Sequence, residues 1–386
     1  MFLYLSLWAV FALLSFGVVA VRLLILKWFA LKRYEVKVDK AYEPKISILV
    51  PTYNESEIIN FKLKNLNKID YPSDSLEIIF VDDNSQDDTP KIISNFIKQH
   101  PEINAQLIIR KERTGKTAAL NYALKYCSGE IVIISDADCL WEPNILRRAI
   151  PYLSLPEVGA ISGPQVLLNP NQSWVTKAEE SYLKTLHAAR LGESRIDSTL
   201  FFEGGFCAYK RKLLNLFDPY NTGSDDNGTV IQILEKNHRT LFVPEAKFYT
   251  TFPISWRERV NLKIRRSSQL LRVLMKYLKL LLNGKLKRAR KIVILNLLAY
   301  VVSPIFFILF SIMSLIVLLH FPFIVLILVI FIVPRIRIYL LDAIMGFLAL
   351  IFGMILNASN KRFTFWSQPQ SRALFNRDLL LKYELI

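Results

Sequence analysis

The chain has 386 residues, of which 52% are hydrophobic, and its formal net charge is +16. Its mean hydropathy of +0.28 excludes an ordinary soluble protein and indicates one sizeable folded domain together with membrane segments. The three cysteines Cys127, Cys139 and Cys207 have no metal-ligand spacing and form no even framework, which excludes a disulfide-stabilised scaffold.

Most of the positive charge lies in one segment. Residues 257–291 contain thirteen basic residues and one acidic residue, so this segment supplies +12 of the total charge. It directly precedes a long apolar region. Basic residues beside membrane spans bind anionic lipid headgroups, so we expect a membrane surface as partner and no nucleic acid.

The first apolar stretch covers residues 1–33 and is long enough to cross a bilayer, which needs about 20 residues. It lacks the basic start and the small-residue cleavage site of a signal peptide, so we expect an N-terminal transmembrane anchor followed by a linker at 34–44. Lys27, Lys32 and Arg33 end this stretch. By the positive-inside rule they place the amino terminus outside and the next domain in the cytoplasm.

The pattern over residues 45–255 predicts alternating strands and helices. Apolar runs predict strands at 46–50, 76–81, 106–109 and 131–134, and helical spacing predicts helices at 55–66, 89–100 and 116–126. Pro51 is expected to end the first strand. This alternation is typical of a mostly parallel, Rossmann-like α/β sheet, whose ligands lie beyond the carboxyl ends of the strands.

Polar clusters follow three of the predicted strands, at 51–55, at Asp82-Asp83 and at Asp136-Ala137-Asp138. Side chains alternate along an extended chain, so Asp136 and Asp138 point the same way and repel each other unless a cation lies between them. Magnesium or manganese suits such hard oxygen ligands. For this pair alone, an Asx-type turn is the structural alternative. Three polar strand ends at one edge of a sheet favour a site.

At these positions the chain resembles a known family. The stretches ISILVPTYNE, IIFVDDNSQDDT, RTGKTAALNYAL and IVIISDADC, in this order over residues 45–140, are similar to the nucleotide-binding half of family 2 glycosyltransferases, which have the GT-A fold. The resemblance continues more loosely through FFEGGFCAYKRKLL and TGSDDNGTVIQIL. It implies an inverting transferase that uses a nucleotide-diphosphate sugar and a divalent cation, Mg or Mn, held by Asp136 and Asp138.

The strand ends can also bind the donor on physical grounds. Tyr53 can cover one face of a nucleobase, and Asp82 or Asp83 can accept hydrogen bonds from base or ribose. Arg113 and Lys116 precede a helix, where cations and backbone N–H groups favour a diphosphate. A packing aromatic, a helix N-cap and a solvated basic loop are the structural alternatives. The predicted nucleotide-sugar site comprises Pro51, Tyr53, Glu55, Asp82, Asp83, Arg113, Lys116 and Asp136, with Arg265 and Arg266 from the basic segment.

The general base and the acceptor site are expected later in this domain. The family usually carries Glu-Asp at the start of a helix, with the Asp as base. This chain has Asp225-Asp226, so position assigns the base to Asp226 and a supporting role to Asp225. Adjacent carboxylates also stabilise helix N-termini, which is the alternative. Glu203, Gly204 and Gly205 are expected to let backbone approach the acceptor closely, and an ordinary turn is the alternative.

Processive members of the family carry Gln-x-x-Arg-Trp after the catalytic domain, and the tryptophan is missing here. One register, Lys263-Ile264-Arg265-Arg266-Ser267, keeps an arginine. A second, Gln269-Leu270-Leu271-Arg272-Val273, keeps the glutamine and the arginine. This departure favours the addition of one sugar over polymer synthesis. The arginines of the first register can reach the donor diphosphate or face lipid headgroups.

The remaining chain predicts membrane elements. Residues 256–291 combine cations with helically spaced apolar residues, which is typical of amphipathic helices in the headgroup plane. Residues 292–357 predict about three transmembrane helices, at 292–311, 314–333 and 338–357. Three C-terminal spans place the tail 358–386 outside the cytoplasm, and two with a re-entrant segment place it inside. Asp342 is costly in lipid and is expected to face protein, headgroups or an acceptor path.

These features predict a multi-pass cell-membrane enzyme with a cytoplasmic catalytic domain. It would transfer a sugar from a UDP- or GDP-linked donor to a lipid-linked acceptor, such as a polyprenyl phosphate or a lipid-linked glycan. A processive polysaccharide synthase is the alternative enzyme, and a membrane adaptor with a decayed nucleotide-binding domain is the alternative outside enzymes. The carboxylates at Asp136, Asp138, Asp225 and Asp226 argue against decay.

Overall fold

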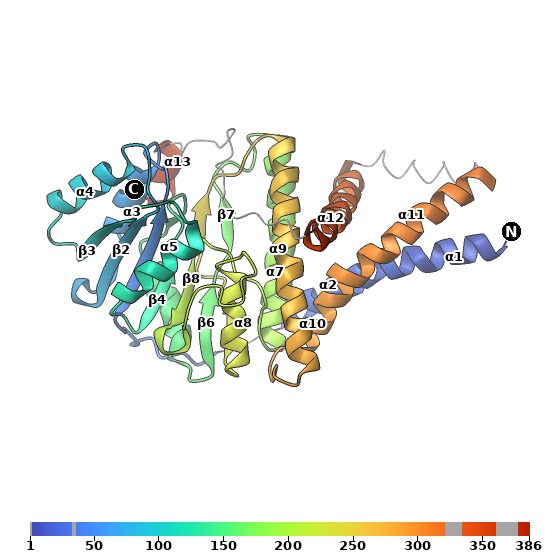
Figure 1. Cartoon of the computed structure of the whole chain (residues 1–386), viewed down its shortest axis with the longest axis horizontal. Coiled ribbons are helices and arrows are strands. Elements are labelled where there is room, and N and C mark those ends of the chain that lie inside the picture. Colours follow the sequence, from blue (N-terminus) through green and yellow to red (C-terminus); the bar gives the residue numbers. More distant parts are fainter. Residues whose placement is uncertain (1, 33–35, 321–333, 360–376) are drawn as a thin grey trace.

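A computed structural model describes residues 2–32, 36–320, 334–359 and 377–386. An α/β domain lies at one end of the molecule and apolar helices lie at the other (Figure 1). Two long helices, α7 (Trp174–Ile196) and α9 (Trp256–Leu282), stand between these two parts (Figure 1).

Seven strands form the main sheet in the order β3-β2-β1-β4-β8-β6-β9. β1 pairs in parallel with β2 and β4, β2 with β3, and β6 with β9, whereas β8 runs antiparallel between β4 and β6. The mostly parallel α/β sheet predicted from the sequence is confirmed. The strands are β1 (Ile46–Thr52), β2 (Leu76–Asp82), β3 (Ala105–Ile109), β4 (Ile131–Ile134), β6 (Val158–Ser162), β8 (Cys207–Lys210) and β9 (Arg239–Phe242).

Both faces of the sheet are buried, which explains the continuous apolar runs of its strands. Ile48 and Val50 pack into one hydrophobic core, and Leu49 packs into a second core on the opposite face. The shorter helices of the domain are α3 (Ile59–Asn67), α4 (Thr89–Gln99), α5 (Lys116–Ala123), α6 (Ile145–Ala149) and α8 (Asn227–Glu235). The 3₁₀ turns are η2 (Ser73–Ser75), η3 (Leu124–Tyr126), η4 (Ile150–Ser154) and η5 (Arg211–Leu213).

The first strand is longer than predicted, because Pro51 continues β1 and pairs with Val81 of β2. The expectation that Pro51 ends the strand is therefore wrong. On the other side of β1, the pairing with β4 stops at Leu49, so the missing N–H of Pro51 removes no hydrogen bond from that ladder. The extension carries the chain to Thr52, directly before Tyr53.

A second, three-stranded sheet lies beyond the carboxyl end of β4. It consists of β5 (Leu140–Trp141), β10 (Phe248–Thr250) and β7 (Gln165–Leu167), in that order. The short C-terminal helix α13 (Arg377–Lys382) packs against it through Leu380, which is buried with Leu140 and Tyr249. The described part of the C-terminal tail therefore lies on the α/β domain (Figure 1). The tail residues 360–376 lie outside the described residues.

Three helices are long and apolar enough to span a membrane, as judged over the described ranges of the chain: Leu3–Leu31, Arg290–His320 and Leu340–Ala358. The first comprises α1 (Phe2–Ala12), the π-helical turn η1 (Leu13–Gly17) and α2 (Val18–Leu31), and the second α10 (Arg290–Leu297), the π-helical turn η6 (Leu298–Val302) and α11 (Ser303–His320). The third belongs to α12 (Pro334–Ala358). The second helix continues past residue 311, where the first C-terminal span was expected to end. The expected span 314–333 overlaps α11 and otherwise lies outside the described residues.

Ion pairs attach these helices to the long helices α7 and α9. Arg22 on α2 pairs with Glu193 on α7 at 3.0 Å. Asp342 on α12 pairs with Arg259 and Lys263 on α9 at 2.8 and 2.7 Å, so it faces protein, one of the environments expected for it. Arg259 also pairs with Glu179 on α7. Each charge of the apolar helices named here is thus held by a charge on α7 or α9.

Candidate active site

The carboxyl ends of β1, β2 and β4 open into a cleft of about 1170 Å³. Pockets for a single small ligand have volumes of about 300–1,000 Å³, so this cleft has room for a donor and part of an acceptor. It is lined by all the predicted site residues except Asp82: Pro51, Tyr53, Glu55, Asp83, Arg113, Lys116, Asp136, Asp138, Glu203, Gly204, Gly205, Asp225, Asp226, Arg265 and Arg266.

The donor end of the cleft is built from the loops after β1 and β2. The Arg113 guanidinium lies 3.7 Å from the centre of the Tyr53 ring, which places a cation and an aromatic face together. The Asp83 carboxylate accepts the N–H of Gly115 at 2.7 Å, and Gly115 adopts a φ of +94° that favours glycine. Asp82 is buried and accepts from the Ser85 amide at 2.8 Å. Between the two acidic residues left open by the sequence, Asp83 is the one that faces the cleft.

Lys116, the first residue of α5, lies between two carboxylates. Its Nζ is 2.6 Å from Asp136 Oδ1 and 2.8 Å from Asp225 Oδ2. Burial opposes the charge of this ammonium, but the two carboxylates outweigh burial and raise the pKa of Lys116 well above its usual value. The lysine therefore stays charged and joins the strand end that carries Asp136 to the start of α8.

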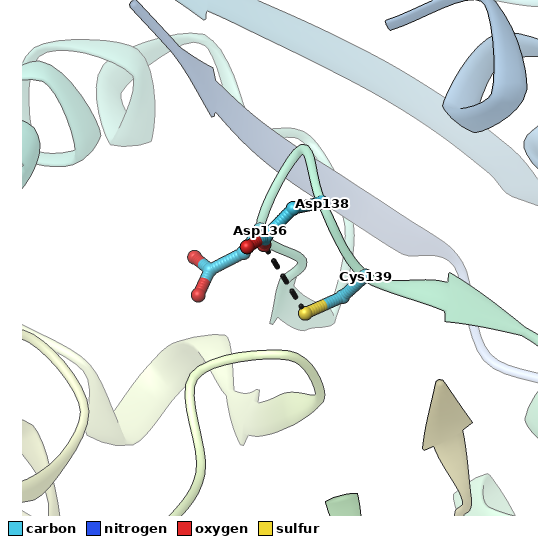
Figure 2. Close-up of side chains that lie close together, drawn as sticks. All are labelled: Asp136, Asp138 and Cys139. Carbon is cyan, nitrogen blue, oxygen red and sulfur yellow. Dashed lines mark hydrogen bonds between the residues drawn. The ribbon is translucent and has the colours of Figure 1, made fainter. Parts of the chain in front are cut away.

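The turn between β4 and β5 gathers three possible metal ligands, Asp136, Asp138 and Cys139 (Figure 2). Their ligand atoms lie within 4.8 Å of one another. Burial raises the pKa of the Cys139 thiol well above its usual value. Its soft sulfur is in any case a poorer ligand than a carboxylate for hard cations such as Mg²⁺ and Mn²⁺. The two carboxylates remain as a pair of hard oxygen ligands. Such a pair fits Mg²⁺ or Mn²⁺, which complete their coordination with water and substrate phosphates.

Asp226 caps the N-terminus of α8 and faces the cleft. Its Oδ1 accepts the Asn227 N–H at 2.6 Å and also accepts from the Ser224 hydroxyl. Burial and the neighbouring charge of Asp225 raise the pKa of Asp226 to about 6. Asp226 therefore makes the helix-capping contact that the sequence offered as the alternative. Its pKa is also suitable for a general base that works near neutral pH.

The Glu203 side chain is engaged by protein groups. It forms an ion pair with Arg190, lies 3.3 Å from His187, and accepts the Gln165 N–H at 2.7 Å. Burial alone would raise the pKa of Glu203, but Arg190 and His187 lower it to about 2. Gly204, beside it, lies against Lys116 and Asp136, where a Cβ would approach Asp136 Oδ2 to 3.0 Å. The backbone at this glycine reaches the centre of the cleft.

Both registers of the basic segment reach the cleft from α9. Burial and the adjacent charge of Arg266 lower the pKa of Arg265 to about 10. In the other register, the Gln269 amide donates to the Gly223 carbonyl, and Arg272 lines the same wall. Gln269 and Arg272 follow Arg265 by about one and two turns of α9. Side chains at this spacing lie on the same face of a helix, so both registers face the loop before Asp225.

Two further cations, one lining the cleft and one buried behind the Asp136–Asp138 turn, were not predicted from the sequence. Arg190 on α7 lines the cleft and holds Glu203, and nothing in its spacing singles it out. Lys62 on α3 is fully buried, donates to the Cys139 carbonyl at 2.6 Å and also donates to the Ser135 hydroxyl. Burial lowers the pKa of Lys62 to about 7. In the sequence, Lys62 lies on the same face of the predicted helix as Ile59 and Leu66. A single lysine on an apolar helix face was the signal that could have indicated a buried cation.

Comparisons with known proteins agree with this geometry. Residues 44–268 match the family described as "Glycosyltransferase like family 2". The chain is 31% identical over 151 residues to a β-monoglucosyldiacylglycerol synthase of Nostoc sp., a match covering 39% of this chain and 32% of that protein. It is 27% identical over 223 residues to an N-acetylglucosaminyltransferase of Rhizobium meliloti, covering 54% of this chain and 52% of that protein. The chain thus spans about a third to a half of the length of these curated relatives.

One solved structure is similar over nearly the whole chain. It is the mannosyltransferase PcManGT from Pyrobaculum calidifontis in complex with GDP-Man and Mn²⁺. The TM-score is 0.79 at 26% identity, and the match covers 92% of this chain and 99% of that chain. The similarity therefore extends beyond the α/β domain into the apolar helices. From the family match, the sheet topology and this structural similarity, we conclude that the chain belongs to glycosyltransferase family 2, has a GT-A fold and is a glycosyltransferase.

Proposed function

We propose that this glycosyltransferase is membrane-bound and inverting, and that it transfers a sugar from a nucleotide-diphosphate sugar to a lipid-linked acceptor with the help of Mg²⁺ or Mn²⁺. One observation carries the proposal: a single cleft holds the donor-side groups, the Asp136–Asp138 pair and Asp226, and extends to Tyr300 beside the apolar helices. The relatives support the two substrates. PcManGT was solved with GDP-Man and Mn²⁺, and the Nostoc relative is named for a diacylglycerol product.

The proposed step is a single displacement at the anomeric carbon. The bond between the acceptor oxygen and the anomeric carbon forms while the bond to the diphosphate oxygen breaks, and Asp226 accepts the proton of the acceptor hydroxyl. Arg113 and Lys116 would pair with the diphosphate. A divalent metal held by Asp136 and Asp138 supplies positive charge that neutralises the departing diphosphate.

The far end of the cleft suits an amphiphile. Leu186 on α7, Leu262 on α9 and Tyr300 on η6 line it, next to Arg265 and Arg266. Apolar side chains here can contact a lipid chain entering from the bilayer, while the arginines can contact its polar headgroup. The loss of the tryptophan of Gln-x-x-Arg-Trp supports the transfer of one sugar.

The need for a general base distinguishes the two proposed classes of acceptor, a polyprenyl phosphate and a lipid-linked glycan. A phosphate is mostly ionised near neutral pH, because its second pKa is about 6, and it needs no base to attack. A sugar hydroxyl does need one. Asp226, with its pKa raised to about 6, therefore favours a hydroxyl of a lipid-linked glycan over a polyprenyl phosphate as the acceptor.

A donor screen tests this function. Detergent-solubilised protein is incubated with labelled GDP- and UDP-sugars and a lipid extract, with Mn²⁺, with Mg²⁺ or with EDTA. We expect transfer to the lipid fraction from one donor class, with loss of activity in EDTA and a product carrying one added sugar. Products of increasing length would instead support a processive synthase, and the absence of any donor binding or transfer would contradict the proposal.

Asp226→Asn provides the matched variant. We expect transfer to a hydroxyl acceptor to fall by about 10²–10⁴-fold, the usual contribution of a general base, with donor binding largely unchanged. Both are measured, by product formation and by equilibrium binding of the donor nucleotide with Mn²⁺. If transfer survives, the base lies elsewhere, and Asp225→Asn is the next variant. If only transfer to a phosphate acceptor survives, the acceptor assignment changes.

A further inference from the structure

The C-terminal segment 377–386 is docked by apolar side chains. Leu380 and Leu385 are both fully buried, in a cluster with Ile58 before α3, Leu140 on β5 and Tyr249 on β10. By contrast, Leu381 on the same helix is 52% exposed. The segment therefore presents a defined face to the α/β domain.

The backbone after α13 turns to place Leu385. Glu384 has a φ of +56°, a left-handed conformation that residues with a side chain adopt only when their surroundings favour it. The Leu385 N–H donates to the Leu380 carbonyl at 2.8 Å and closes this turn. The Tyr383 ring lies 5.2 Å from the ring of Tyr249. Helix, turn and ring contact all fix the same short segment.

Besides the packing of Leu380 and Leu385 with Leu140 of β5, the docked segment reaches the turn that carries Asp136 and Asp138 through Asn65 on α3. The Asn65 amide donates to the Leu385 carbonyl at 2.7 Å and to the Trp141 carbonyl at 2.8 Å. Its carbonyl oxygen accepts the Trp141 N–H at 2.8 Å. Asn65 is fully buried, and β5, to which Trp141 belongs, begins two residues after Asp138. One side chain therefore ties the end of the chain to the strand that follows the carboxylate pair.

The same helix supports the other half of that turn. Lys62, one turn before Asn65, donates to the Cys139 carbonyl and to the Ser135 hydroxyl. Ser135 and Cys139 bracket the segment 136–138. Neither Lys62 nor Asn65 lines the cleft, so Lys62 supports the two ends of the turn, and Asn65 the strand after it, from outside the cleft. The C-terminal segment packs on Ile58 and accepts a hydrogen bond from Asn65.

We propose that the C-terminal segment 377–386 is a positioning element for the active site, which fixes the turn bearing Asp136 and Asp138 through Asn65 and β5. The inference rests on the proposed role of these carboxylates as metal ligands. Groups that orient ligands from behind change metal affinity by about 10–100-fold when removed. The segment follows the last apolar helix, so the geometry of the metal site depends on a part of the chain far from the catalytic motifs.

Adjacent residues of α13 offer a matched pair of variants. Leu380→Asp puts a charge into the buried cluster and should release the segment, whereas Leu381→Asp adds the same charge at an exposed position. The first readout is hydrogen exchange of the peptide 139–142, with the peptide 131–134 of β4 as an internal reference. We expect faster exchange at 139–142 in Leu380→Asp only. The second readout is Mn²⁺ binding to the protein, followed by loss of the free-ion EPR signal, where we expect about tenfold weaker binding in Leu380→Asp only.

Two further variants keep the test decisive. If Leu380→Asp lowers the yield of folded protein, deletion of 377–386 makes the same comparison without a buried charge. Asn65→Ala combined with the deletion should weaken Mn²⁺ binding by less than the two single changes multiplied, because both remove the Asn65–Leu385 hydrogen bond. Exchange at 139–142 and Mn²⁺ affinity that stay at wild-type values after release of the segment would overturn the proposal. Absence of Mn²⁺ binding in the wild type would instead contradict the metal role, and the exchange comparison would still decide whether the segment fixes the turn.

Discussion

At the start of α8, burial and the charge of Asp225 raise the pKa of the Asp226 carboxyl to about 6. Below that pH the group is protonated and cannot accept a proton, so kcat/KM for transfer to a hydroxyl acceptor should fall about tenfold per pH unit and reach its plateau above about pH 7. A pH–rate profile between 4.5 and 8 measures this. Because Asp225 raises the pKa, Asp225→Asn should shift the acid limb to lower pH. An acid limb that stays in place would assign the titration to another group.

Lys116 connects the two halves of the site, and its removal gives a second prediction. Its charge lowers the pKa of Asp226 and balances Asp136 and Asp225. Lys116→Met should therefore move the acid limb of the pH–rate profile to higher pH. It should also raise the donor KM by about 10–100-fold, because a charged hydrogen bond to the diphosphate contributes about 1.5–3 kcal/mol. Lys116→Arg keeps the charge and should retain the wild-type limb. A raised donor KM with an unchanged acid limb of the pH–rate profile would show that Lys116 binds the diphosphate but does not set the pKa of Asp226.

The sequence predicts residue types at the site better than it predicts which atoms face the ligand. Because side chains alternate along a strand, only one of Asp82 and Asp83 is expected to face the cleft. Which of the two does so depends on the register of β2 against β1, and the structure pairs Asp82 with Thr52. Glu203 was predicted on the basis of its neighbouring glycines. Its carboxylate is instead bound to Arg190, a residue from a helix that no motif connects to it.

Among the elements, α2 and α7 are in close contact at Gly192, where an added Cβ would lie 2.0 Å from the Leu26 carbonyl oxygen. The methyl group of Gly192→Ala should therefore push α2 away from α7. As with other overpacked contacts, we expect the free energy of unfolding to fall by about 1–3 kcal/mol. Thermal unfolding in one detergent measures the change. Gly346→Ala on α12 is the control, because an added Cβ there meets no described atom within 4 Å, and we expect equal or slightly higher stability. Equal effects of the two variants would show that this contact tolerates a methyl group.

Long apolar or amphipathic elements were predictable because each carries a repeated pattern. β2 begins at the predicted residue, and α4 ends one residue earlier than predicted. The sheet β5-β10-β7 was missed, since strands of two or three residues contain no period to detect. The sequence also contains no signal that β8 runs antiparallel between β4 and β6. That orientation follows from tertiary pairing alone.

At the scale of the whole molecule, the sequence located the apolar regions and left their arrangement open. Hydropathy alone cannot say whether residues 292–333 form one long helix or two spans, because both bury the same side chains in lipid. The structure shows one continuous helix from Arg290 to His320 and a separate helix α12 that packs on α9, with the described part of the tail packed on the α/β domain. Basic residues of α9 lie between this domain and the apolar helices, where they can meet anionic headgroups (Figure 1).

This arrangement predicts the sides of the membrane on which three positions lie. Tyr4 and His320 meet at one end of the apolar helices, with ring centres 5.7 Å apart, whereas the exposed residues Lys40 and Lys382 flank the α/β domain and its docked tail. If the helices span the bilayer, His320 lies on the face opposite both lysines. In a Cys127→Ser background, a membrane-impermeant maleimide added to intact cells should label His320→Cys, and it should label Lys40→Cys and Lys382→Cys only after permeabilisation. Each variant labelled after detergent solubilisation controls for reactivity. Labelling of Lys382→Cys in intact cells, with Lys40→Cys protected, would place the tail and the α/β domain on opposite sides and contradict both the topology and the docking of the C-terminal segment.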